Sequence, residues 1–244
     1  MFKKPTPIVL GMLVTFVVSF AAFGVGMRIS PEVAALYDAL TLSPLRIVHG
    51  RQLWGVVSYA LLHDLTSPFH LVFNCLSLYW FGPEAEARWG ARRFALFCLA
   101  TTVVGALFAV AAHIAHLSDA DVVGASAITT GLILAWALAN RDRQVMFFFF
   151  QVKGIQLVWI LIGFEILNAI SLSGTSAACH FGGMLVGWLG SDVSPLRRWI
   201  LQRKLRSLTA QSTALRGVRL GKADPGLRVI QGGAGRRPRK DELN

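Results

Sequence analysis

The sequence is poor in charged residues. Asp, Glu, Lys and Arg make up 15% of its 244 residues, whereas hydrophobic residues make up 54%. In an average soluble domain about a quarter of the residues are charged. The shortage of charge excludes an ordinary soluble domain of this length and indicates a membrane protein.

Cysteine is also scarce. Cys75, Cys98 and Cys179 all lie in apolar stretches, so the sequence predicts neither a disulfide framework nor a zinc site. The helical His-Glu-x-x-His pattern of metalloproteases is absent as well. The three cysteines are best interpreted as small buried hydrophobic side chains.

The excess of positive charge is confined to the C-terminal end. The net charge is +11, and the segment 197–244 holds thirteen Lys or Arg residues, all between 197 and 240, against three acidic residues, Asp224, Asp241 and Glu242. The pattern at 195–208 favours a basic amphipathic helix that lies on anionic lipid. Residues 221–244 are rich in Gly and Arg and are expected to be disordered. Membrane attraction explains this tail more simply than nucleic-acid binding, so we expect no nucleic-acid partner.

Six apolar segments are long enough to be membrane-spanning helices. A cleavable signal peptide is the alternative for the first segment, but Gly24–Met27 is a poor cleavage site and the rest of the chain is itself polytopic. Residues 28–64 are expected to form a long loop with interfacial amphipathic pieces. The expected spans are 7–27, 67–83, 94–113, 122–139, 155–172 and 175–190.

The distribution of basic residues predicts the orientation. With six crossings both termini lie on one side, and that side carries most of the Lys and Arg in the loops, which marks it as cytoplasmic. We therefore expect an integral protein of a bacterial cytoplasmic membrane with both termini in the cytoplasm. The basic positions on this side are Lys3, Lys4, Arg88, Arg92, Arg93, Arg141, Arg143, Lys153 and the C-terminal tail.

This orientation brings four polar side chains from three spans to one depth near the outer face. Ser126 is expected about one turn below the outer end of its span, and His180 one to two turns down the sixth span. In the second span, His70 and Asn74 share a face because they are four residues apart. Polar groups inside hydrocarbon are candidates for function. Interhelical hydrogen bonding is the structural alternative for each of them.

Together these residues could perform acyl transfer. A serine hydroxyl needs a base, and histidine has a suitable pKa, so Ser126 and His180 are expected to form a catalytic dyad. His70, Asn74 and the Ser126 N–H could bind an oxyanion. The predicted spans hold no aspartate, so a third, orienting carboxylate is absent unless Glu165 in the fifth span serves as one. A structural hydrogen bond from Glu165 to another helix is favoured over a catalytic role.

The motifs resemble those of the rhomboid family of intramembrane serine proteases. The resemblance covers about 53–190 and is carried by His70-Leu-Val-Phe-Asn74, Gly124-Ala-Ser126 and His180-Phe-Gly-Gly183. It implies an all-α polytopic fold of the rhomboid type. Together with the expected spans and the charge pattern, we expect a six-transmembrane-helix, rhomboid-like bundle over residues 1–193, followed by a basic cytoplasmic tail at 194–244. It also implies that single-pass membrane proteins are the substrates and that no cofactor or metal is needed.

Two positions depart from the usual rhomboid pattern. The family usually has Gly after the serine, whereas this chain has Ala127, and many members have an aromatic residue where Thr130 stands. An extra methyl at a tight helix contact could shift the serine relative to its base. A catalytically weak or inactive rhomboid-like protein that binds membrane helices therefore remains the alternative. Gly183 and Gly187 are expected to pack the sixth helix closely against the fourth.

Overall fold

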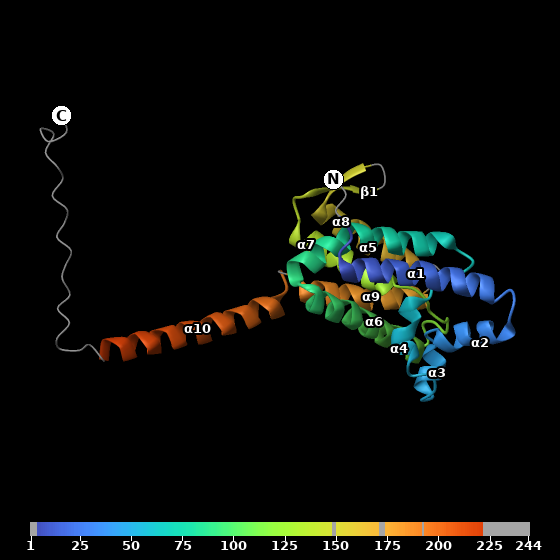
Figure 1. Cartoon of the computed structure of the whole chain (residues 1–244), viewed down its shortest axis with the longest axis horizontal. Coiled ribbons are helices and arrows are strands. Elements are labelled where there is room, and N and C mark those ends of the chain that lie inside the picture. Colours follow the sequence, from blue (N-terminus) through green and yellow to red (C-terminus); the bar gives the residue numbers. More distant parts are fainter. Residues whose placement is uncertain (1–3, 148–149, 171–173, 192, 222–244) are drawn as a thin grey trace, which may run out of the picture. The chain divides into compact units, whose positions relative to one another are not determined.

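The computed structural model describes residues 4–147, 150–170, 174–191 and 193–221 (Figure 1). The chain divides into two compact units, Met1–Arg198 and Trp199–Asn244. The first unit is mostly helical and contains every element from α1 to α9. It also contains all the predicted site residues.

Three long helices form where apolar segments were expected. These are α1 (Pro7–Gly26), α5 (Pro68–Trp89) and α6 (Ala91–Ile114). Proline in the first turn of α1 and α5 fits its fixed φ angle and its missing N–H. In the described part of the chain, α1 and α6 are the two helices that are long and apolar enough to cross a membrane by length and composition.

Three shorter helices complete the bundle. They are α7 (Ser126–Ala139), α8 (Gly154–Ile170) and α9 (Gly174–Gly190). Each of the six expected segments is thus helical over most of its described residues, but α7 begins at Ser126 and not at Val122. The cause lies at Gly124, whose φ of +119° cannot continue an α-helix. Ser126 is thus the first residue of its helix, instead of lying one turn inside it.

The loop between α1 and α5 folds into short helices. These are α2 (Pro31–Leu40), α3 (Pro44–Val48), α4 (Gly55–Ser58) and the 3₁₀ helix η1 (Tyr59–Leu61). Tyr59 is fully buried, and its hydroxyl donates a hydrogen bond of 2.9 Å to the carbonyl oxygen of Thr102 in α6. This contact fixes the loop on the helical bundle.

A hairpin corrects the expectation of a purely helical fold. Strands β1 (Gln144–Phe147) and β2 (Phe150–Lys153) pair antiparallel. Valine and phenylalanine favour strands, which gives a local reason for the hairpin. The aromatic anchor expected at 147–150 lies only partly within the described residues, because positions 148 and 149 are outside them; Phe150 is exposed.

Helix α9 packs closely against both α6 and α7. A Cβ atom on Gly183 would lie 2.1 Å from the carbonyl oxygen of Ala127, and one on Gly187 would lie 2.2 Å from that of Gly131. Only glycine permits such an approach between helix backbones. The expected close packing of the fourth and sixth apolar helices is confirmed.

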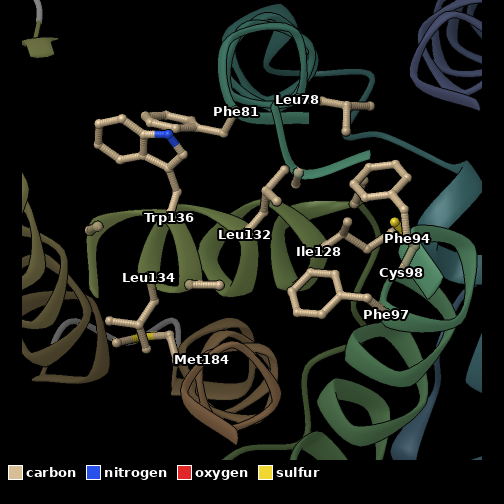
Figure 2. Close-up of a cluster of buried hydrophobic side chains, with 14 of the residues drawn as sticks. Leu78, Phe81, Phe94, Phe97, Cys98, Ile128, Leu132, Leu134, Trp136 and Met184 are labelled. Carbon is tan, nitrogen blue, oxygen red and sulfur yellow. The ribbon is translucent and has the colours of Figure 1, made fainter. Parts of the chain in front are cut away.

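The other face of α7 forms a hydrophobic core. In Figure 2, Ile128, Leu132 and Trp136 lie along α7, and the ring of Phe81 in α5 lies beside the Trp136 ring. Other members of this buried cluster are Leu78, Phe94, Phe97, Leu134 and Met184. The serine end of α7 is therefore held by glycine contacts on one side and by apolar side chains on the other.

Helix α10 (Pro195–Gly221) contains the predicted basic segment 195–208. Its exposed apolar side chains include Trp199, Leu205 and Leu208, and the Arg203 guanidinium lies 4.0 Å from the centre of the Trp199 ring. Of the segment expected to be disordered, residues 222–244 lie outside the described part of the chain.

Candidate active site

Ser126 lies at the N-terminus of α7 and is 8% exposed. The chain before it is held by backbone hydrogen bonds: Val122 pairs with Leu42 in both directions, and the Gly124 N–H donates to the carbonyl oxygen of Tyr59 at 3.0 Å. As the first helical residue, Ser126 has an N–H group without an intrahelical acceptor. Its hydroxyl therefore lies beside a backbone N–H that has no acceptor within the helix, and beside the positive end of the helix dipole.

His180 on α9 contacts Ser126 directly. The Ser126 Oγ lies 2.7 Å from the His180 Nε2, although the two residues are 54 positions apart in the sequence. Both side chains are buried. The hydroxyl of Ser176, one turn before His180, lies 3.5 Å from the same nitrogen. The geometry allows the imidazole to accept the serine proton.

Glu165 on α8 contacts the other side of the imidazole. Its Oε2 lies 2.8 Å from His180 Nδ1, and the residue is only 1% exposed. The expected hydrogen bond to another helix is present, but its partner is the proposed base itself. The sequence did not predict this contact, because a separation of fifteen positions does not reveal which helix faces meet.

Asn74 and His70 lie on α5 beside the start of α7. The Asn74 Nδ2 donates a hydrogen bond of 2.8 Å to the His70 carbonyl oxygen, and its Oδ1 accepts one of 2.9 Å from the Thr129 hydroxyl. A Cβ atom on Gly124 would lie 2.5 Å from His70 Cε1, so only glycine leaves room for this ring. Thr129, which the sequence analysis did not identify, thus orients the Asn74 amide.

His63 lies next to His70, in the loop before α5. The two ring centres are 5.5 Å apart, and His63 is 1% exposed. Neither of its ring nitrogens has a hydrogen-bond partner among the described residues. Burial, and to a lesser extent the nearby His70, lowers the pKa of His63 to about 4. The described residues contain no group of three or more His, Cys, Asp or Glu side chains that could hold a metal ion.

The Rhomboid domain family matches residues 50–193, which are more than half of the chain and include all four predicted site residues. The chain belongs to the rhomboid family. It is also similar to RHOMBOID-like protein 7 of Arabidopsis thaliana, with 26% identity over 172 residues. The matched segment covers 70% of this chain and 52% of the relative, so the chain spans about half the relative's length. Because the relative is from a plant, this comparison does not support the expected bacterial membrane.

The first departure from the usual rhomboid motif is accommodated by a small neighbour. The Ala127 side chain is buried and faces Gly105 on α6, where an added Cβ would lie 2.9 Å from the Ala127 Cβ. Gly105 therefore provides the space that the extra methyl group needs. The Ser126–His180 contact is 2.7 Å with alanine in place.

The second departure, Thr130, bonds within its own helix. Its hydroxyl donates to the carbonyl oxygens of Ser126, at 2.8 Å, and Ala127, at 3.3 Å. Threonine hydroxyls often bond back to the preceding turn in this way. Thr130 does not contact the base in these bonds, and the imidazole of His180 is bonded at Nδ1 by Glu165.

Proposed function

We propose that this rhomboid protein is an intramembrane serine endopeptidase that uses Ser126 and His180 to hydrolyse peptide bonds in or near the transmembrane segments of single-pass membrane proteins. The observation that carries the proposal is the 2.7 Å contact between the Ser126 Oγ and the His180 Nε2, from two different helices. A nucleophile and a base within hydrogen-bond reach are the first requirement of this chemistry.

The proposed reaction begins when His180 takes the Ser126 proton and Oγ attacks the substrate carbonyl carbon. The resulting oxyanion lies at the N-terminus of α7, where the Ser126 N–H, the Asn74 amide and the His70 ring are the donors. Each well-placed donor contributes roughly 3–4 kcal/mol to transition-state stabilisation in related enzymes. His180 then gives its proton to the leaving amine, and a water molecule hydrolyses the acyl-enzyme.

The membrane setting is part of the proposal. Helix α7 has 14 residues, so it is about 21 Å long, whereas the hydrocarbon core of a bilayer is about 30 Å thick. If the inner end of α7 is at the cytoplasmic interface, Ser126 lies roughly 9 Å below the outer edge of the core. We propose six crossings with both termini in the cytoplasm, because the basic loops and the tail share that side.

The tail is proposed to bind the anionic surface of the same membrane. Helix α10 carries exposed apolar side chains together with five basic residues in its first half, at 197, 198, 203, 204 and 206. A helix of this composition lies in the interface with its apolar groups in the lipid and its cations near the headgroups.

The alternative is a rhomboid-like pseudoprotease that binds membrane helices without cutting them. It is favoured by the departures at Ala127 and Thr130 and by the limited identity, 26%, to RHOMBOID-like protein 7. The proteolytic function is preferred because Ser126 and His180 are both present and in contact.

The test is labelling of the purified protein in detergent by a fluorophosphonate probe, which reacts only with an activated serine. The parent is compared with the variants Ser126→Ala and His180→Ala, and folding is checked by thermal unfolding. We expect the parent to label and both variants to lose labelling. A folded parent that does not label would refute the proposed function and favour the pseudoprotease.

A further inference from the structure

We propose that Glu165 is a positioning residue that completes a Ser126–His180–Glu165 triad, by holding the imidazole through Nδ1 so that Nε2 faces the serine. The inference rests on the proposed function, which needs only Ser126 and His180. It adds a third, separately testable residue from a third helix.

The first argument is geometric. The imidazole of His180 is hydrogen-bonded at both nitrogens: Nε2 lies 2.7 Å from Ser126 Oγ, and Nδ1 lies 2.8 Å from Glu165 Oε2. The three residues lie on α7, α9 and α8. Two bonds on opposite sides of the ring fix its rotation about both side-chain torsions. Without the carboxylate, the hydrogen bonds to the ring from described residues would all be at Nε2, where the Ser176 hydroxyl also lies, at 3.5 Å.

The second argument concerns the orientation of Glu165 on α8. The large apolar side chains next to it point outward, with Phe164 63% and Leu167 68% exposed, whereas Glu165 is 1% exposed. An acidic side chain within an apolar membrane helix is costly and is found facing a partner in the protein interior. Glu165 is directed to His180.

The third argument is chemical. The proposed triad has Glu165 ionised, and an ionised carboxylate only accepts hydrogen bonds, so in the triad the proton of the neutral imidazole is on Nδ1. The lone pair is then on Nε2, where it can accept the Ser126 proton. During attack the Ser126 O–H bond breaks, the proton moves to Nε2 and the Oγ–carbon bond forms. The Nδ1 proton stays on the imidazole, and the carboxylate stabilises the imidazolium without being protonated.

The test compares Glu165→Gln, Glu165→Asp and the parent, with Glu86→Gln as a matched control. Glu86 is also a buried glutamate, 5% exposed, but it accepts hydrogen bonds from the Thr6 hydroxyl and the Val9 N–H at the start of α1. Each protein is assayed for cleavage of a single-pass transmembrane substrate and for the rate of fluorophosphonate labelling, per folded molecule. The folded fraction comes from thermal unfolding.

We expect Glu165→Gln to lower kcat and the labelling rate by about 10²- to 10⁴-fold with KM nearly unchanged, because the amide also allows the unproductive tautomer. Glu165→Asp should have a kcat and a labelling rate at least about tenfold higher than those of Glu165→Gln, because it restores the carboxylate. Glu86→Gln should lower thermal stability and leave kcat per folded molecule unchanged. Parental kcat in folded Glu165→Gln would overturn the proposal while leaving the proposed function intact.

A second measurement needs no variant at Glu165. The ¹⁵N chemical shifts of the His180 ring, assigned by their loss in His180→Gln, report which nitrogen carries the proton. We expect the Nδ1-protonated tautomer in the parent. The Nε2-protonated tautomer would overturn the positioning role even if Glu165→Gln failed to fold. If the folded parent does not label at all, the proposed function fails and the catalytic triad fails with it.

Discussion

The contact between Ala127 and Gly105 gives the sharpest test of how helix packing sets the site. A Cβ atom added at Gly105 would lie 2.9 Å from the Ala127 Cβ and 3.0 Å from both the carbonyl oxygen and the Sγ of Cys179. Carbon atoms in contact prefer about 3.5–4.0 Å, so Gly105→Ala requires a shift of at least about 0.6 Å. Because Cys179 precedes His180, part of that shift would move the proposed base.

The expected cost of Gly105→Ala is about 1–3 kcal/mol of unfolding free energy, as for other overpacked cores. A shift of this size would also lengthen the 2.7 Å contact between Ser126 and His180 towards the limit of a hydrogen bond and slow probe labelling. Adding Ala127→Gly removes the shortest of the three close contacts, so the double variant should recover part of the stability and part of the labelling rate. The contacts with Cys179 remain, so recovery should be incomplete.

The assay is a double-mutant cycle on thermal or denaturant unfolding, with the labelling rate as a second readout. Replacing glycine in a helix also changes stability by about 1 kcal/mol through helix propensity. This contribution is the same in both backgrounds, so it cancels in the coupling energy that the cycle measures. Gly11→Ala is the control, because a Cβ atom there meets nothing within 4 Å, and it should not destabilise the protein. Additive effects of the two substitutions would refute the reasoning that Gly105 accommodates Ala127.

Three further predictions concern the surroundings of the site and the tail. Burial lowers the pKa of His63 in the folded protein to about 4, whereas the unfolded chain takes up a proton near pH 6.5. The His63 contribution to the unfolding free energy should therefore be full above pH 6.5 and fall by up to about 1.4 kcal/mol per pH unit between pH 6.5 and pH 4. In thermal unfolding, His63→Leu should flatten this pH profile. Equal pH dependence in both proteins would contradict it. Thr129→Val should cost about 1–3 kcal/mol in denaturant unfolding, because the Asn74 Oδ1 loses its donor. Trypsin should cut at Lys204 more slowly in anionic than in zwitterionic nanodiscs, and equal rates would argue against lipid binding.

The helices of the bundle could be predicted from the sequence because length and apolar composition determine them. The expected spans at 7–27, 94–113 and 155–172 agree with α1, α6 and α8 to within a few residues at each end. The start of α7 was misplaced by four residues, because an apolar run does not reveal that Gly124 has a positive φ. The hairpin at 144–153 was missed because short apolar runs do not distinguish strands from membrane anchors.

The site itself could be predicted only in part, for a reason of geometry. Motif residues such as Ser126 and His180 were identified as candidates because each interrupts an apolar stretch at a shared depth. Depth along a helix follows from residue counting, whereas the direction in which a side chain points depends on how neighbouring helices are rotated. Thr129 points to Asn74 and Glu165 points to His180, and these directions could not be read from the sequence.

The rotation of the helices is set by the glycines, and this links packing to chemistry. Gly183 against Ala127 and Gly187 against Gly131 fix α9 on α7 in one register, which brings the Nε2 of His180 to Ser126. With α9 in this register, the Nδ1 side of the ring faces α8, where the Glu165 carboxylate lies within hydrogen-bond distance at 2.8 Å. Substitutions at the α7–α9 glycines should therefore disturb both bonds of the imidazole together, whereas substitution of Glu165 should disturb one.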